Sequence, residues 1–106
     1  MFNKLLKLIL ILFIASFAHA DEVMKLGLEV FNEKAACNAC HILKAAGSEG
    51  NVGPSLDSLN PSPTVEQVKD IVTHGLGVMP AFGEEGLLTN EEIDAVSIYV
   101  AKTAGK

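Results

Sequence analysis

Apolar side chains recur every three to four residues in three parts of the chain, and this spacing is typical of amphipathic α-helices. The first part covers residues 21–34, where Asp21 and Glu22 suit the positive end of a helix dipole. We expect this helix to continue close to Cys37. The other two parts lie in the second half of the chain, so the pattern predicts at least three helices.

Each of the two later helices has a recognisable starting point. Thr64 and Thr89 are both followed three residues later by a glutamine or a glutamate, which is the capping-box pattern. The helices predicted from these starts span residues 64–74 and 89–103. Gly75 ends the former, because glycine is a poor helix former.

The remaining segments lack helical periodicity. Residues 45–63 are rich in Gly, Ser, Asn and Pro and are expected to form a loop, as are residues 81–88. No segment alternates with a period of two for long enough to predict a strand. The predicted fold class is therefore all-α, with three to four short helices. Loops of this length are unusual in a small domain and make sense if they surround a cofactor.

The first twenty residues have the organisation of a secretory signal peptide. Lys4 and Lys7 form a positive region, residues 8–18 are an apolar run, and a small-x-small cleavage signal follows. The apolar run is short for a membrane span, although an uncleaved anchor is the alternative. We predict a cleaved signal peptide over residues 1–20, and one mature domain over residues 21–106 in the periplasm.

The net charge of the chain limits the classes of partner that it is expected to bind. Thirteen acidic residues and eight lysines give a formal net charge of −5, and loss of Lys4 and Lys7 with the signal peptide would change it to −7. An acidic surface argues against nucleic acid and anionic lipid as partners. It suits a partner with a basic docking patch, at a rate that falls with salt. The alternative is that the acidity only keeps a secreted protein soluble.

Both cysteines of the chain lie in one motif, Cys37-x-x-Cys40-His41. This pattern is typical of covalent c-type haem attachment. Two thiols add across the two vinyl groups of one porphyrin, so they must lie about one helical turn apart. The adjacent histidine then supplies its imidazole to the iron as proximal ligand. The motif predicts one covalently bound haem c and electron transfer as the function.

Two other uses of the cysteines need features that the sequence lacks. The Cys-x-x-Cys of a thiol–disulfide oxidoreductase lies beside a βαβ unit, and no strand is predicted in this chain. A zinc site would need a fourth ligand beyond Cys37, Cys40 and His41, at the usual finger spacing.

The second axial ligand of the iron has one leading candidate, Met79. It lies in a loop that glycines bracket and Pro80 stiffens, so its thioether would be presented from a fixed backbone position. His74, at the end of a predicted helix, is the rival ligand, and its alternative role is to bond terminal carbonyls or face water. Met24 lies on the first helix, where we expect it to pack.

With these positions the mature chain resembles the class I c-type cytochromes, small monohaem electron carriers. The haem-attachment motif and the downstream Met79 match that family in order. Gly27 and Phe31 match its Gly-x-x-x-Phe/Tyr pattern on the first helix, and Tyr99 is similar to the aromatic on the last helix that crosses this glycine. The resemblance implies a cytochrome c-like fold wrapped around one haem.

The segment Gly53-Pro54-Ser55-Leu56 is similar to the family's Gly-Pro-x-Leu segment. The resemblance implies that the Pro54 carbonyl takes the Nδ1 proton of His41 and so fixes the tautomer of the ligand. The cofactor-binding residues it implies are Cys37, Cys40, His41, Pro54 and Met79, with His41 and Met79 as the ligands of the iron.

The expected function is a periplasmic one-electron carrier with His–Met ligation, working between a donor dehydrogenase and an acceptor oxidase or reductase. It would not be an enzyme, would not bind nucleic acid and would not insert into a membrane after signal cleavage. One alternative is the dedicated haem subunit of a periplasmic dehydrogenase complex. Another is a haem enzyme or gas sensor in which Met79 is labile.

Overall fold

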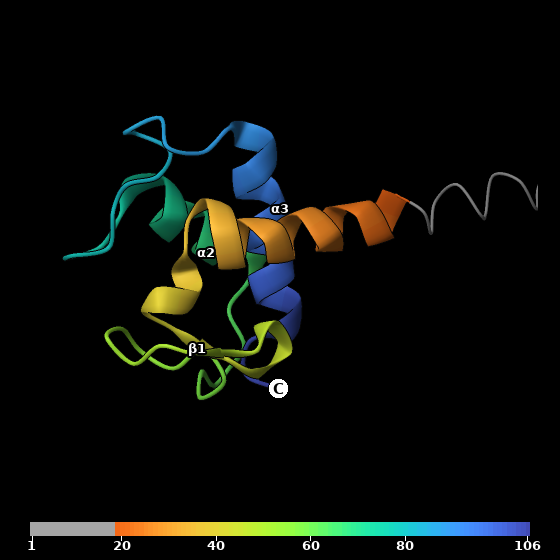
Figure 1. The fold of residues 1–106 in the computed structure, drawn as a ribbon, viewed down its shortest axis with the longest axis vertical. Coiled ribbons are helices and arrows are strands. Elements are labelled where there is room, and N and C mark those ends of the chain that lie inside the picture. The colour runs from red at the N-terminus through yellow and green to blue at the C-terminus, as the bar shows by residue number, and fades with distance from the viewer. Residues whose placement is uncertain (1–18) are drawn as a thin grey trace, which may run out of the picture.

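The computed structural model describes residues 19–106, so the signal peptide expected over residues 1–20 lies outside the described residues except for its last two. The fold is mostly helical, as predicted. Among the described residues no helix is long and apolar enough to cross a membrane. Figure 1 shows the arrangement. After a helix over residues 19–29 the elements are η1 (Val30–Lys34), η2 (Cys37–Ala39), β1 (Ile42–Leu43), η3 (Lys44–Ala46), β2 (Ser48–Glu49), α2 (Val65–His74) and α3 (Asn90–Thr103).

The first helix ends three residues before Cys37. Its last turn, η1, is a π-helix, and the Ala35 N–H donates to the Val30 carbonyl at 2.9 Å. Ala36 then adopts a left-handed backbone (φ 51°), a conformation that costs a non-glycine residue about 1–2 kcal/mol. This reversal separates the helix from η2, so the cysteines lie in a tight turn of their own.

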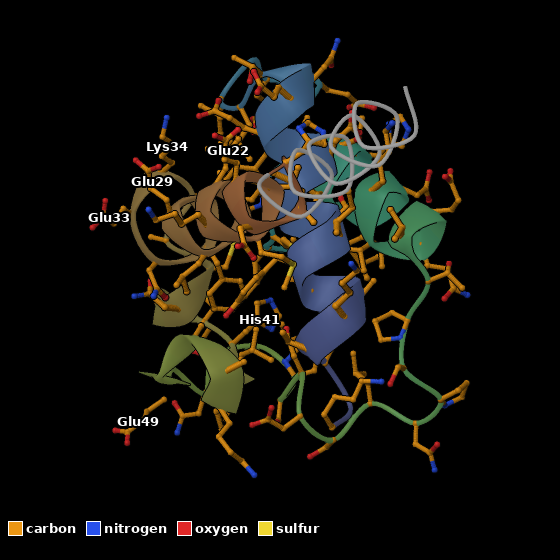
Figure 2. The ribbon with its side chains drawn as sticks, turned by 90° about the vertical axis from the view of Figure 1, so that its right-hand side faces the viewer. Glu22, Glu29, Glu33, Lys34, His41 and Glu49 are labelled. Atoms are coloured by element: carbon orange, nitrogen blue, oxygen red, sulfur yellow. The ribbon has the colours of Figure 1, made fainter. Side chains whose placement is uncertain are left out.

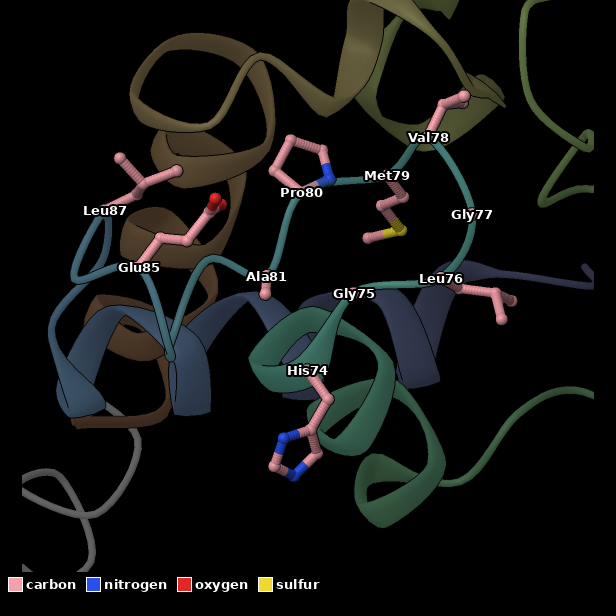
Figure 3. A pocket seen from close by; sticks show the side chains of 10 residues that line it. All are labelled: His74, Gly75, Leu76, Gly77, Val78, Met79, Pro80, Ala81, Glu85 and Leu87. Carbon is pink, nitrogen blue, oxygen red and sulfur yellow. The ribbon is translucent and has the colours of Figure 1, made fainter.

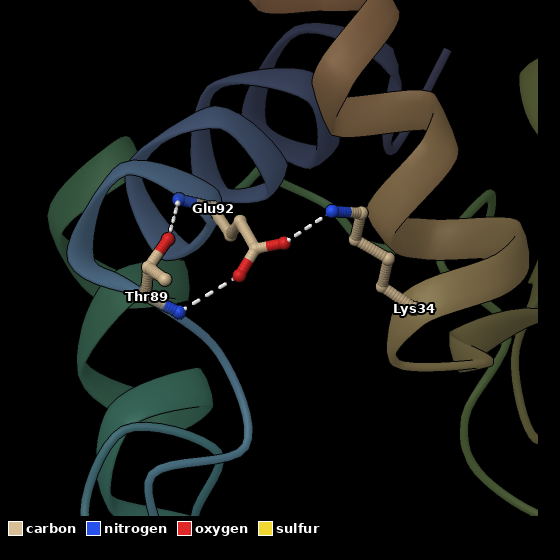
Figure 4. Close-up of polar contacts among 3 residues, drawn as sticks. All are labelled: Lys34, Thr89 and Glu92. Atoms are coloured by element: carbon tan, nitrogen blue, oxygen red, sulfur yellow. Dashed lines mark hydrogen bonds and ion pairs between the residues drawn. The ribbon is translucent and has the colours of Figure 1, made fainter.

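The two predicted capping boxes are present at the starts of α2 and α3. Thr64 Oγ1 accepts from the Gln67 N–H at 3.1 Å, and Thr89 Oγ1 accepts from the Glu92 N–H at 3.2 Å. Glu92 also accepts from Lys34 at 2.8 Å, and this ion pair joins the end of the first helix to the start of α3 (Figure 4). The Lys34 ammonium and the Thr89 backbone N–H hold the pKa of Glu92 below its usual value.

The first helix crosses α3 at Gly27, as the family pattern implied. A Cβ built on Gly27 would lie 2.5 Å from Tyr99 Cβ and 2.6 Å from the Ala95 carbonyl oxygen, so only glycine fits this approach. Beside the crossing, the rings of Phe31 and Tyr99 pack with their centroids 6.3 Å apart and tilted by 51°. The crossing is visible in Figure 1, where the first helix runs across α3.

The structure contains one small sheet that the sequence pattern did not predict. β1 and β2 pair antiparallel, with Ile42 opposite Glu49 and Leu43 opposite Ser48. Two-residue strands are too short to show a period of two. Ser48 holds the pair together, because its Oγ accepts from the Leu43 N–H and donates to the His41 carbonyl, each at 2.8 Å.

The core lies where the first helix, α2 and α3 meet. The buried apolar side chains come from these helices and from the segments that join them: Val30, Phe31, Leu43, Val68, Val72, Phe82, Leu88, Ile93, Val96, Tyr99, Val100 and Ala104. Met24 packs against this cluster, which confirms the packing role expected for it.

Substitution of Gly27 by valine should destabilise the fold by about 1–3 kcal/mol, because the new side chain must push Tyr99 and the Ala95 carbonyl away. Thermal unfolding of the purified protein measures the loss. Lys25→Val is the matched control, since it places valine at an exposed position of the same helix and should cost no more than about 0.5 kcal/mol. Equal melting of the two variants would mean that the helices do not cross at Gly27.

Candidate haem site

The Cys-x-x-Cys-His motif forms a compact turn. The Cys37 carbonyl accepts from the N–H groups of both Cys40 (3.1 Å) and His41 (2.9 Å), so the motif closes on itself within one turn. This geometry matches the one-turn separation of the two thiols that attachment to a single porphyrin requires. Gly50 packs against the outside of the turn, where a Cβ would lie 2.5 Å from the carbonyl oxygens of Asn38 and Ala39.

The imidazole of His41 is held by a backbone carbonyl. Its Nδ1 lies 2.8 Å from the Pro54 oxygen. A carbonyl only accepts hydrogen bonds, so Nδ1 carries the proton and Nε2 keeps its free lone pair. This is the tautomer that a metal-ligating histidine with a carbonyl partner adopts. The contact implied by the Gly-Pro-x-Leu segment is therefore present.

Gly53 lies against the face of the same ring. A Cβ at this position would be 2.8 Å from His41 Cε1 and 3.1 Å from its Nδ1, so a larger residue would displace the imidazole. The Gly53 N–H also donates to the Cys40 carbonyl at 2.7 Å. The loop that supplies the Pro54 carbonyl is thus tied directly to the attachment turn.

Gly50 and Ser48 shape this side of the site and were not predicted from the sequence, and Gly53 was named only as part of the Gly-Pro-x-Leu segment. Gly50 and Gly53 allow close backbone approaches, and Ser48 binds the His41 carbonyl. Two glycines three residues apart, shortly after the motif in sequence, indicate positions where another part of the backbone or a side chain can come close. The sequence does not identify the group that comes close to them. Ser48 gave no signal, since serine is common in loops.

Met79 is presented by a tight loop at the end of α2. Leu76 and Met79 exchange backbone hydrogen bonds of 3.2 and 3.0 Å, and Gly75 takes up a positive φ of 76° that lets the chain leave the helix. The loop lines an open hollow of about 730 Å³ with Glu85 and Leu87 (Figure 3). Met79 is half-buried and packs against the same core cluster as Cys37, so both face the middle of the domain.

His74, the rival ligand, is occupied elsewhere. Its Nδ1 pairs with the Glu84 carboxylate, and its Nε2 lies 3.6 Å from Asp70. Figure 3 shows the ring pointing away from Met79, and 56% of its side chain is exposed. The Glu84 hydrogen bond raises the pKa of His74, and Asp70 adds to the effect. This geometry favours a surface ion pair over iron ligation.

The cysteines are not arranged for thiol or zinc chemistry. Burial raises the pKa of Cys37 to about 11, so its thiolate is scarce at neutral pH, whereas redox thiols have a lowered pKa. Over residues 19–106 no group of three or more His, Cys, Asp and Glu side chains is placed to hold a metal ion. The donor set that remains is two thiols and an imidazole in one turn, which fits a covalently bound haem. These features define a haem-binding protein of the cytochrome type.

Comparison with known proteins identifies the family. The family model described as cytochrome c oxidase, cbb3-type, subunit III matches residues 22–100. The chain belongs to the class I c-type cytochromes, as a small monohaem member, and its cofactor is one haem c.

Individual relatives agree with this assignment. Cytochrome c6 of Gloeothece citriformis is 39% identical over 76% of this chain and 71% of its own length. Cytochrome c6 of Leptolyngbya boryana is 38% identical over 76% of this chain and 92% of its own length. The crystal structure of the c-type cytochrome SorU from Sinorhizobium meliloti has a TM-score of 0.72 and 44% identity, covering 81% of this chain and 95% of that one. The protein is therefore a haem electron carrier.

Substitution of Gly53 by alanine should weaken the hydrogen bond between His41 and Pro54, because the added methyl group would press on the imidazole. We expect the Nδ1 proton of His41 in the holoprotein to exchange about tenfold faster with solvent, which corresponds to one lost hydrogen bond. NMR measures this exchange. Val52→Ala, at the exposed neighbouring position, should leave it unchanged. Unaltered exchange in Gly53→Ala would mean that the glycine does not position the ring.

Proposed function

We propose that the protein is a periplasmic one-electron carrier whose haem iron is held by His41 Nε2 and Met79 Sδ. The observation that carries the proposal is the hydrogen bond from His41 Nδ1 to the Pro54 oxygen. It leaves Nε2 as the ring nitrogen whose lone pair can bind the iron. Cys37 and Cys40 would attach the porphyrin through thioether bonds. The bound haem supplies the ferric–ferrous couple.

Residues of the chain would affect the reduction potential of this couple and the exposure of the site to water. The Pro54 carbonyl makes His41 a more basic ligand, which stabilises the ferric state. A thioether from Met79 favours the ferrous state and raises the potential. Cys37 and Met79 both pack against the apolar core, so part of each side chain is shielded from water.

The same geometry supports a carrier over an enzyme or gas sensor. Either of those would need an iron position open to a small molecule, with polar groups beside it. His74 is the histidine nearest in sequence to Met79, and its ring points away from that residue toward Glu84 (Figure 3). If His41 and Met79 both hold the iron, no position would be left on it for a substrate.

The first experiment is the absorption spectrum of the holoprotein, ferric and ferrous, with carbon monoxide added to the ferrous form. We expect a c-type spectrum with the weak ferric sulfur-to-iron band and no response to carbon monoxide. Met79→Ala should lose the band, bind carbon monoxide and have a lower potential, because the thioether is gone. His74→Ala is the control and should retain the wild-type spectrum. A wild-type protein that lacks the band, together with carbon monoxide binding gained in His74→Ala alone, would assign the ligand to His74.

We further propose that redox partners dock over the Met79 loop. Leu76, Val78 and Leu87 are exposed there, Val78 to 95%, and Glu85 lines the hollow beside them. An apolar patch with an acidic neighbour fits a partner that carries an apolar contact inside a basic rim. Val78 of this patch is adjacent in sequence to the proposed ligand Met79. An electron that enters over the patch would therefore travel a short distance to the iron.

Reversal of one charge on this surface tests the docking proposal. The probe is the cationic donor hexaammineruthenium(II), which reduces the ferric protein. Glu85→Lys should slow the reduction by about twofold to fivefold at low salt, and the difference should vanish at high salt because screening removes it. Glu29→Lys is the matched control, since Glu29 projects from the first helix (Figure 2) and does not line the hollow beside the Met79 loop. Equal slowing by both variants would count against electron entry over the Met79 loop.

A further inference from the structure

The loop that carries Met79 is closed at its base by contacts between the end of α2 and residues 82–84. The Phe82 N–H donates to the Val72 carbonyl at 2.9 Å, and the Glu84 N–H donates to the Thr73 carbonyl at 3.1 Å. These backbone bonds bring the returning chain beside the last turn of α2. Movement of Met79 away from its position requires this base to loosen or the loop to bend above it.

One side-chain pair spans the same base. His74, the last residue of α2, pairs with Glu84 through Nδ1, and the two are 56% and 58% exposed. The pair therefore adds a third connection, directly below Gly75, where the loop begins. Unlike the two backbone bonds, this connection depends on the protonation of an imidazole.

Two charged groups face His74, and both favour its protonated form. Glu84 faces Nδ1 from the returning chain, and Asp70 faces Nε2 from the preceding turn of α2. Glu85 lines the same hollow. On α3, which packs against α2, Asp94 is paired with Lys69 at 2.8 Å.

We propose that the His74–Glu84 pair is a positioning contact that holds the Met79 loop closed while His74 is protonated, and that release of Met79 from the iron becomes faster when His74 loses its proton. This inference rests on the proposed role of Met79 as a ligand. It makes His74 a residue that acts through Met79 without contacting the cofactor.

The direction of the pH effect follows from the raised pKa of His74, whose largest cause is the Glu84 hydrogen bond. A group whose pKa is raised in the folded state contributes its stabilisation below the unfolded pKa and loses it as the pH rises through the folded pKa. The unfolded value for histidine is about 6.5, so the charge-assisted part of the contact weakens as the pH rises above this value. Exposed ion pairs are weak, which limits the effect on release to about twofold to fivefold.

The test uses the ferric holoprotein and azide, which remains one anion over the range studied. At saturating azide the displacement rate equals the rate at which Met79 leaves the iron. Between about pH 6 and about pH 9 the wild-type rate should rise by about twofold to fivefold, with the midpoint that NMR gives for the titration of His74.

Three variants separate a positioning role from general destabilisation. Glu84→Ala should show the fast rate at every pH, and Glu66→Ala, which removes an equal charge from the first turn of α2, should behave as wild type. His74→Arg should stay slow throughout, because arginine keeps its charge and can pair with Glu84.

The possible outcomes distinguish this inference from the proposed function. A wild-type rate that is flat through the titration of His74, or equal rates in Glu84→Ala and Glu66→Ala, would overturn the positioning role and leave Met79 as the ligand. Absence of the ferric sulfur-to-iron band, or azide binding that Met79→Ala does not accelerate, would overturn the ligand assignment itself.

Discussion

The approach of the first helix to α3 at Gly27 is the contact on which the rest of the structure depends. The helix backbone reaches the Ala95 carbonyl and Tyr99, and no other residue type fits between them. This contact fixes where the first helix ends, and Lys34 secures that end to the start of α3 through Glu92. The cysteine turn follows three residues later, so its position is set by the crossing. A domain of this size has a modest apolar core, and a bound haem supplies the apolar bulk that its helices alone do not.

The helices and their packing could be predicted from the sequence because each has a local cause. The capping boxes at Thr64 and Thr89 mark helix starts through contacts within four residues, and the structure contains both. The helix crossing could be predicted because Gly27 and Tyr99 match the family pattern. The β1–β2 pair could not be predicted, because two-residue strands have no periodicity and depend on one hydrogen-bonding serine, Ser48.

The candidate site was predictable in its residue types but not in what surrounds them. The donors Cys37, Cys40, His41 and Met79 were named from spacing and resemblance, and their roles as ligands remain predictions. The approach of Gly53 to the His41 ring joins residues twelve apart through a loop with no regular structure. The pairing of His74 with Glu84 depends on how the chain returns to α2, which no local pattern specifies.

The two sides of the proposed haem site are secured by different kinds of interaction. On the His41 side the bonds run to backbone carbonyls and to Ser48, none of which titrates near neutral pH. On the Met79 side the base of the loop combines backbone bonds with an exposed imidazole–carboxylate pair. If His41 and Met79 bind the iron as proposed, a change of pH near neutrality acts on one ligand and spares the other. Weaker retention of Met79 would then lower the potential, because a thioether ligand favours the ferrous state, while attachment through the cysteines would keep the haem in place. The fold thus confines pH sensitivity to the loop where redox partners are proposed to dock.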